Sequence, residues 1–300
     1  MAGTTRIQPG NRSFSPQYSL WSDGATKRRW IYLPPGSAID ASDPDAWNFP
    51  VGTRLWKEFS YSRPIETRYI ERLPSGSWLF AAYVWNDDGS DAILAPEAGL
   101  PGHVANEAPG GRYPIPSRED CLACHEGAAV PVLGFSALQL SPDRDGQAVR
   151  AETPHPADLL LTSLVSQGLI VNLPDELLAR PPRITAPSPA ARSALGHLHA
   201  NCGHCHNNGG PLTLLDLVLA QSVAGGVTSA DDMLQTLVGQ RSDFDLPGAS
   251  QRIVPGLPSH SVLALRMRAR DPLTQMPPLG TQIPDSEGIA LVERWIREQL

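Results

Sequence analysis

Residues 199–210 read HANCGHCHNNGG, and this stretch places two cysteines and three histidines within eight consecutive positions. A related stretch, DCLACHEG, occupies residues 120–127. The chain has four cysteines, and all four belong to two identical Cys-x-x-Cys-His frames, at 121–125 and 202–206. Because the two frames use every cysteine of the chain, they indicate one chemistry that is used twice.

Cys-x-x-Cys-His is the attachment pattern of c-type haem. Two thiols three residues apart can reach both vinyl groups of one porphyrin as thioethers, and the adjacent His then binds the iron as proximal ligand. The frames therefore predict two covalently bound haem c groups. The attachment residues and proximal iron ligands are Cys121, Cys124 and His125 for the first haem and Cys202, Cys205 and His206 for the second. His204, inside the second frame, is not expected to bind iron.

Three alternative roles for the cysteines fit the spacing less well. A zinc site built from two Cys-x-x-Cys pairs is chemically possible, but the 77 residues between Cys124 and Cys202 far exceed the spacing of zinc ribbons or fingers. Thioredoxin-like redox pairs do not need a His directly after both second cysteines. Disulfides across such short loops would be small and strained. The pattern therefore favours haem.

Met276 is the predicted distal ligand of the second haem. It lies in QMPPLG (275–280), after the second frame and before the closing helix, which is the order of motif, Met loop and C-terminal helix in small cytochromes c. A Met/His pair raises the reduction potential, which suits electron transfer. The alternative for Met276 is packing of a loop side chain into the core, and Met267 is expected to pack inside a helix.

The distal ligand of the first haem is open. His199 lies three residues before Cys202, so it could bind the iron of a neighbouring haem, or it could be a helix-end residue that holds a haem propionate. The sequence does not settle this, nor does it exclude a sixth position without a protein ligand. We expect His199, or another histidine, to fill the sixth position of the first haem, because LHANCGHCH (198–206) places an imidazole where the two haem modules would meet. The candidate histidines are His103, His155, His197, His199 and His260.

The first part of the chain has the pattern of a β domain. Sixteen of the 19 aromatic residues lie before residue 114, and stretches such as SWLFAAYVWNDD (77–88) combine β-formers with a turn signal. We expect antiparallel strands over about 20–110, followed by a Gly/Pro-rich linker. The predicted segments are 1–115 as β domain and linker, 116–185 as a first haem module, and 186–300 as a second, cytochrome c-like haem module.

The later part of the chain has helical periodicity. Residues 155–170 place Leu160, Leu161, Leu164 and Val165 on one stripe, and 189–201 lead into the second frame. Residues 284–300 predict a closing helix with Asp285 as N-cap. With 26 Gly and 30 Pro, the expected class is a loop-rich α+β fold with an N-terminal antiparallel β domain and a C-terminal helical, cytochrome c-like di-haem region.

Charge and hydropathy restrict the classes of binding partner and the cellular location that we expect. The net charge of −7 argues against nucleic acid and against an anionic membrane surface, and favours a redox partner protein with a basic or neutral docking surface. No apolar run approaches the length of a membrane span. Residues 1–14 contain no apolar signal core, yet haem attachment of this kind happens outside the cytoplasm. We therefore expect a periplasmic or otherwise exported protein whose signal peptide is absent from this chain.

Nearly the full length of the chain resembles an uncharacterised bacterial family of exported di-haem cytochromes c. The matching stretches are YSLWSDGATKRRWIYLPPG (18–36), FPVGTRLWKEF (49–59), IETRYIER (65–72), YVWNDDGSDAIL (83–94), CLACH (121–125), LGFSALQLS (133–141), LHANCGHCH (198–206), PGLPSHSVLALRM (255–267) and MPPLG with PDSEGIALVERWI (276–280, 284–296). The resemblance implies a periplasmic location, a β domain before two haem modules, and a redox role without a defined substrate.

These features predict a periplasmic di-haem c-type cytochrome that transfers electrons between redox partners, as a free carrier or as the haem subunit of an oxidoreductase. The alternative is a catalytic di-haem enzyme, a peroxidase or small-molecule oxidase with one open haem. In that case the β domain could close the substrate pocket, and the candidate polar residues are Asp23, Lys27, Glu66 and Arg68. Ordinary solvated charges on strands and turns are the simpler interpretation of these four.

Overall fold

The computed structural model describes residues 7–224 and 229–300 and divides the chain into two compact units. Unit 1 contains residues 1–15, 24–123 and 153–178, and unit 2 contains 16–23, 124–152 and 179–300. Neither unit is continuous in sequence. Residues 116–185, expected as a first haem module, are shared between the two units.

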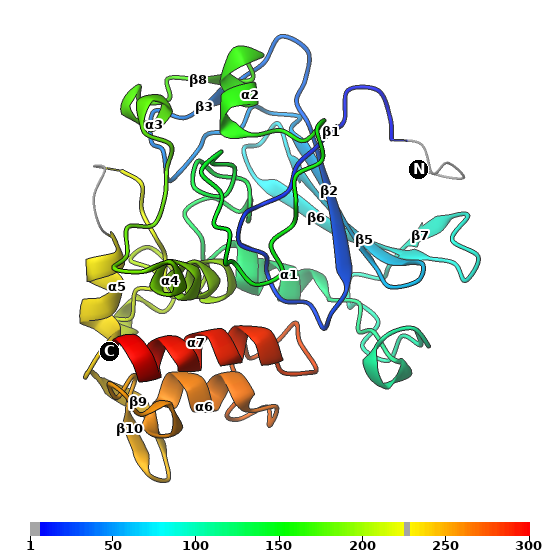
Figure 1. Cartoon of the computed structure of the whole chain (residues 1–300). Helices are drawn as coiled ribbons and strands as arrows, with labels where there is room; N and C mark the ends of the chain where they lie inside the picture. Colours follow the sequence, from blue (N-terminus) through cyan, green and yellow to red (C-terminus); the bar gives the residue numbers. More distant parts are fainter. Residues whose placement is uncertain (1–6, 225–228) are drawn as a thin grey trace. The chain divides into compact units, whose positions relative to one another are not determined.

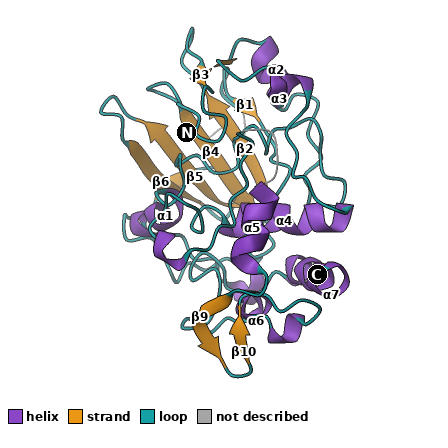
Figure 2. Cartoon of the chain, turned by 90° about the vertical axis from the view of Figure 1, so that its left-hand side faces the viewer, coloured by secondary structure: helices purple, strands orange, loops and turns teal. Residues whose placement is uncertain are grey.

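Unit 1 is built on a six-stranded antiparallel sheet, which confirms the expected antiparallel β structure. Its strand order is β1-β2-β4-β5-β6-β7. Figure 2 shows the longer strands of this sheet side by side. The strands are β1 (Arg12–Ser13), β2 (Thr26–Tyr32), β4 (Arg54–Ser60), β5 (Pro64–Arg72), β6 (Trp78–Trp85) and β7 (Ala92–Leu94).

The sheet has one strongly buried face, here called the inner face. Alternate residues of each strand point to the same side, and Ile31, Leu55, Phe59, Phe80 and Val84 are the buried apolar members of the inner face. The opposite face carries partly exposed aromatic residues. This alternation is the pattern that predicted the strands.

Short elements complete unit 1. Strand β3 (Ile39–Asp40) pairs in parallel with β8 (Ile170–Val171), and a 3-10 turn, η1 (Pro109–Gly111), precedes α1 (Arg118–His125). The last two residues of α1, Cys124 and His125, belong to unit 2. The helical stripe predicted over 155–170 is reduced to α2 (Leu161–Ser166). Extended backbone precedes it, since the Leu159 amide donates to the Ser13 carbonyl. Gly168, with a φ of +64°, follows the end of the helix. A further short helix is α3 (Glu176–Ala179).

Unit 2 is mainly helical, and its core lies where α4 packs against α7 (Figure 1). Its elements are α4 (Pro189–Cys202), η2 (Thr213–Leu215), α5 (Ser229–Leu237), the hairpin β9 (Arg241–Leu246) and β10 (Ala249–Gln251), η3 (Pro258–His260), α6 (Val262–Arg268) and α7 (Ser286–Gln299). Leu195 and Leu198 of α4 share one core cluster with Val292, Trp295 and Ile296 of α7. The predicted closing helix and its N-cap are both present, because the Asp285 carboxylate accepts from the Gly288 amide at 3.0 Å.

The two units together make a mixed α+β protein, with seven α-helices among the described residues. This confirms the mixed α+β class, and the cytochrome c-like character of the helical region stays a prediction.

The close approach of α4 and α7 depends on a residue without a side chain. A Cβ atom on Gly288 would overlap the ring of His197. His197 is buried at this point, with its Nε2 atom 3.9 Å from the Asp285 carboxylate. The ring therefore serves as a packing element between the helices.

Candidate functional site

Each Cys-x-x-Cys-His frame lies at the C-terminal end of a helix. The first frame forms the last residues of α1, and α4 ends at Cys202 of the second frame. Ser188 caps the start of α4, since its hydroxyl accepts from the Ala191 amide at 3.0 Å, and Pro189 occupies the first helical position. These local signals fix where the second frame begins.

The second frame continues α4 as a tight turn. The amides of Cys205 and His206 both donate to the Cys202 carbonyl, at 3.1 and 2.9 Å. Gly203 stands where a side chain has no room, because a Cβ atom there would lie 2.7 Å from the His199 oxygen and 2.9 Å from the Ala220 Cα atom. The turn brings both thiols and the His206 ring close to the end of the helix.

The segments that follow the two frames lie against each other within unit 2. The Asn207 side-chain amide donates to the carbonyls of Gly127 and His204, at 2.8 and 3.2 Å. A Cβ atom on Gly127 would lie 2.8 Å from the His204 oxygen, and one on Gly210 would lie 2.7 Å from the Gly127 oxygen. Backbone therefore packs on backbone between two stretches that are some eighty residues apart in sequence.

The thiols are also brought together. Cys124 and Cys205 hydrogen-bond each other through their side chains, which raises the pKa of Cys124 to about 12 and lowers that of Cys205. His204 also hydrogen-bonds Cys124, and this contact opposes part of the rise in the pKa of Cys124. Burial raises the pKa of Cys202 to about 12. None of the four cysteines, all within the described residues, forms a disulfide. Two cysteines predicted to attach haem, one from each frame, are therefore in contact.

The surroundings of the two predicted proximal histidines are compatible with rings that bind iron. His125 Nδ1 lies 2.6 Å from the Pro131 carbonyl oxygen, and such a bond orients the ring and leaves Nε2 for a metal. The His206 ring is buried, and its Nδ1 atom has no hydrogen-bond partner in the structure. Burial, then the nearby His204, Arg266 and Arg252, lower the pKa of His206 to about 4, so the neutral ring that binds metals is favoured.

The loop that carries Met276 is tied to the neighbourhood of His206. The Met276 amide donates to the Arg266 carbonyl at 3.0 Å, and Arg266 Nε donates to the Thr274 carbonyl at 2.9 Å. Arg266 is close enough to His206 to affect its pKa. Met276 is half-buried, whereas Met267 is buried in the core of unit 2, as expected. Ligation by Met276 stays a prediction.

The hydrogen bond at His199 favours a residue that holds a haem propionate over a residue that binds iron. The Gln221 amide donates to His199 Nδ1 at 3.0 Å, so the ring proton lies on Nε2. A protonated Nε2 donates a hydrogen bond and does not bind iron. This arrangement supports a His that holds a haem propionate.

The other candidate histidines differ in their surroundings. His155 and His260 are exposed, and His197 packs between helices. His103, in unit 1, keeps its Nε2 atom buried without a hydrogen-bond partner. Asp23, a candidate pocket residue, instead accepts from the amides of Gln282 and Ile283 in unit 2.

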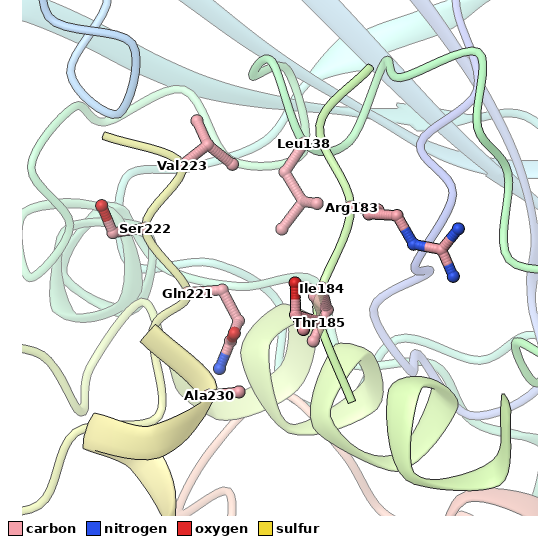
Figure 3. Close-up of a pocket in the computed structure, with 8 residues that line it drawn as sticks. All are labelled: Leu138, Arg183, Ile184, Thr185, Gln221, Ser222, Val223 and Ala230. Carbon is pink, nitrogen blue, oxygen red and sulfur yellow. The ribbon is translucent and has the colours of Figure 1, made fainter. Parts of the chain in front are cut away.

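A surface pocket elsewhere in unit 2 is too small for a prosthetic group. It has a volume of about 10 Å³, which is on the order of the space that one water molecule needs. Figure 3 shows the Arg183 guanidinium pointing away from Leu138 and Val223. Arg183 pairs with Asp143 at 3.1 Å. The pocket carries none of the candidate site residues.

Within the described residues, 7–224 and 229–300, the side chains alone do not form a set of ligands for a metal ion. No group of three or more His, Cys, Asp or Glu side chains there could hold an ion by itself. A haem iron takes its equatorial ligands from the porphyrin and needs a protein ligand only along its axis. His125 and His206 could each supply such an axial ligand without other side chains.

Sequence reasoning missed Asn207 and the glycines at 127 and 210. The position of Asn207, directly after the second frame, was the one available signal. Its partner Gly127 lies 80 residues away, and no spacing rule connects them.

The chain matches no protein family, no curated protein and no solved structure. Of the helices that the structure describes, none is both long enough and apolar enough to cross a membrane.

Proposed function

We propose that this protein is an exported di-haem c-type cytochrome that transfers electrons between redox partners. The observation that carries the proposal is the duplicated Cys-x-x-Cys-His frame, which uses all four cysteines. The contact between Cys124 and Cys205, together with the Asn207 bridge, supports it further.

The chain's own residues have defined parts in this proposal. Cys121, Cys124, Cys202 and Cys205 attach the two porphyrins, His125 and His206 are the proximal iron ligands, and Met276 is the distal ligand of the second haem. Haem supplies a one-electron Fe(III)/Fe(II) couple when it is bound. The Pro131 carbonyl orients His125, and burial keeps His206 neutral.

The contact between the frames favours electron transfer as the role. Attachment residues that touch imply two prosthetic groups close together, and closeness makes exchange between them fast. The net charge of −7, to which the haem propionates add, steers a basic or neutral protein partner. Thioether attachment implies maturation outside the cytoplasm, in the periplasm or after export by another route.

A haem count tests the proposal. Protein made with the c-type maturation machinery should keep its colour after acid–acetone extraction and give two haems per chain in a pyridine haemochrome assay. The double variant Cys121→Ser/Cys124→Ser should give one haem, and so should Cys202→Ser/Cys205→Ser. The single variant His155→Ala, at an exposed histidine outside both frames, is the control and should keep two. Colour lost to the solvent, or stoichiometric zinc in place of iron, would refute the proposal.

One observation favours a catalytic di-haem enzyme as the second candidate. Because the Gln221 amide donates to His199 Nδ1, the proton of His199 lies on Nε2, and His199 is not available as the distal ligand of the first haem. An iron with an open position binds small molecules. Carbon monoxide that binds rapidly to one haem of the ferrous protein would support the enzyme. Slow or absent binding would support the carrier.

A further inference from the structure

Arg266 of α6 holds the loop that carries Met276 at two points. The Arg266 carbonyl accepts from the Met276 amide at 3.0 Å, and Arg266 Nε donates to the Thr274 carbonyl at 2.9 Å. These two bonds lie on either side of Gln275. One residue therefore fastens the loop to the helix through both its backbone and its side chain, and all of these residues belong to unit 2.

The bond to the Met276 amide also completes the end of α6. The last four carbonyl groups of a helix have no partner within the helix, and α6 ends at Arg268. The Met276 amide binds the Arg266 carbonyl, and Arg270 Nη1 donates to the Met267 carbonyl at 3.2 Å. Detachment of the loop would remove a donor from the helix end, so the helix and the loop stabilise each other.

The loop has internal hydrogen bonds of its own. The amides of Thr274 and Gln275 donate to the Asp271 carbonyl at 2.9 and 2.8 Å. Gln275 is buried, and its Nε2 atom donates to the Pro278 carbonyl at 3.1 Å. Because the loop is folded on itself, a contact at Thr274 also restrains Met276, two residues further on.

The Arg266 guanidinium has a second contact, with an aromatic ring. Strand β9 packs beside α6 (Figure 1), and Arg266 Cζ lies 4.1 Å from the centroid of the Phe244 ring. The face of an aromatic ring attracts a cation, more strongly where water is partly removed. Burial lowers the pKa of Arg266, but an arginine side chain stays charged in proteins. The ring and the loop together restrict the side chain to one orientation.

The same guanidinium lies near the predicted proximal histidine of the second haem. Its charge helps to lower the pKa of His206, after burial and His204, and Arg252 contributes to the same effect. The Leu263 amide of α6 donates to the Arg252 carbonyl at 3.1 Å. Proximal and distal ligands bind one iron along its axis, so a loop that is held near His206 is in the region where a distal ligand is needed.

We propose that Arg266 is a positioning residue of the second haem, which holds the loop so that the Met276 thioether binds the iron. This inference rests on the proposed function and on Met276 as the distal ligand. Arg266 itself does not touch the iron in this role. Its planar guanidinium donates to a carbonyl and lies over a ring at the same time, and a lysine does not reproduce this geometry.

Displacement of Met276 by added imidazole tests the proposal in the ferric holoprotein. The Met–iron charge-transfer band reports only a methionine-ligated haem, and imidazole that replaces the thioether bleaches it. In Arg266→Leu, the imidazole concentration that bleaches half of the band should fall about tenfold or more, the ratio that corresponds to loss of one hydrogen bond from a charged donor.

Two further variants separate the hydrogen bond from the charge. Gln carries its Nε2 atom as many bonds from Cα as Arg carries Nε, so Arg266→Gln keeps a donor for the Thr274 carbonyl without the charge and should restore most of the native resistance to imidazole. Arg266→Lys keeps the charge but has a methylene at that position, so it should behave like Arg266→Leu.

Arg241→Leu is the matched control. It removes one positive charge from an exposed position of β9, the strand that carries Phe244, and should leave the half-bleaching concentration unchanged. Each sample is first assayed for two haems, so a failure of haem attachment, which bears on the proposed function, is distinguished from a failure of the positioning role. If Arg266→Leu does not keep two haems, the comparison of Arg266→Gln with Arg266→Lys decides.

Three results would overturn the inference in a protein that carries two haems. One is a half-bleaching concentration in Arg266→Leu equal to that of the native protein. Another is native resistance in Arg266→Lys together with its loss in Arg266→Gln, because the charge and not the hydrogen bond would then matter. The third is a native protein without a Met–iron band, which would have no methionine ligand to position.

Discussion

A hydrogen bond at one ring nitrogen decides what the other nitrogen of a histidine can do. His125 has its Nδ1 atom against the Pro131 carbonyl, so Nε2 keeps its lone pair for a metal. His199 accepts from the Gln221 amide at Nδ1, so its Nε2 carries the proton. Two histidines that look alike in sequence, each within three residues of a motif cysteine, therefore have opposite chemistry.

The variant Met276→Ala tests the predicted distal ligand. Loss of the thioether should abolish any Met–iron charge-transfer band and lower one midpoint potential by on the order of 100 mV, since axial ligands set haem potentials over about 0.8 V. Optical spectra and a redox titration measure both effects. Met267→Leu is the control, because it keeps the buried volume and should leave the potentials unchanged. Survival of the band and both potentials in Met276→Ala would place the ligand elsewhere.

The variant His199→Ala separates the two roles of this residue. If His199 donates through Nε2, the rate and stoichiometry of carbon monoxide binding to the ferrous protein should match those of the native protein. Stopped-flow mixing measures them, with His155→Ala as a control at an exposed histidine. Binding that becomes fast only in His199→Ala would identify His199 as the iron ligand.

At the scale of elements, α4 and α7 hold the core of unit 2, and their ends are fixed by local chemistry. Ser188 and Asp285 cap the two helices through side-chain hydrogen bonds. Arg150 binds the Asp285 carboxylate and lies over the Trp21 ring at 4.8 Å. The start of α7 is therefore held by segments from two distant parts of the chain.

Gly288→Ala should destabilise unit 2 even though Ala is the better helix former. At an exposed helical site, replacement of Gly by Ala stabilises by about 1 kcal/mol. Here the new methyl overlaps the His197 ring, and overpacking costs about 1–3 kcal/mol. We expect a lower free energy of unfolding in urea.

Arg294→Ala, on the exposed side of α7, is the control and should change the stability by less than about 0.5 kcal/mol. An unfolding midpoint of Gly288→Ala at or above that of the native protein would contradict the close packing.

At the scale of the whole molecule, the two frames belong to one local cluster. Asn207 binds the Gly127 carbonyl, and Cys124 contacts Cys205. Two haems attached here would influence each other electrostatically, because charges in a protein interior are weakly screened.

Removal of one haem should therefore shift the potential of the other. In Cys121→Ser/Cys124→Ser, the remaining haem should have a midpoint potential higher than the lower of the two native values, because no neighbouring reduced haem opposes its reduction. A coupling on the order of 1 kcal/mol corresponds to about 40 mV for one electron. Spectroelectrochemistry measures it. A potential identical to the lower of the two native values would show that the haems titrate independently.

The sequence by itself determined the local features of this protein. The two frames, the N-cap at Asp285, the end of α4 near Cys202 and the alternation of the strands all depend on neighbours within a few positions. Chain geometry and side-chain chemistry are sufficient at that range. The predicted haem attachment residues and proximal ligands follow from the same local spacing.

Only the tertiary structure decided which distant residues meet. The Asn207–Gly127 bond, the Gln221–His199 bond and the position of Arg68 near Cys121 join segments that no periodicity relates. The inclusion of 153–178 in unit 1 and the short length of α2 have the same origin, since Leu159 pairs with Ser13. Such contacts depend on how buried surfaces pack and on where backbone groups find partners. Many sequences with the same local patterns could satisfy these requirements differently.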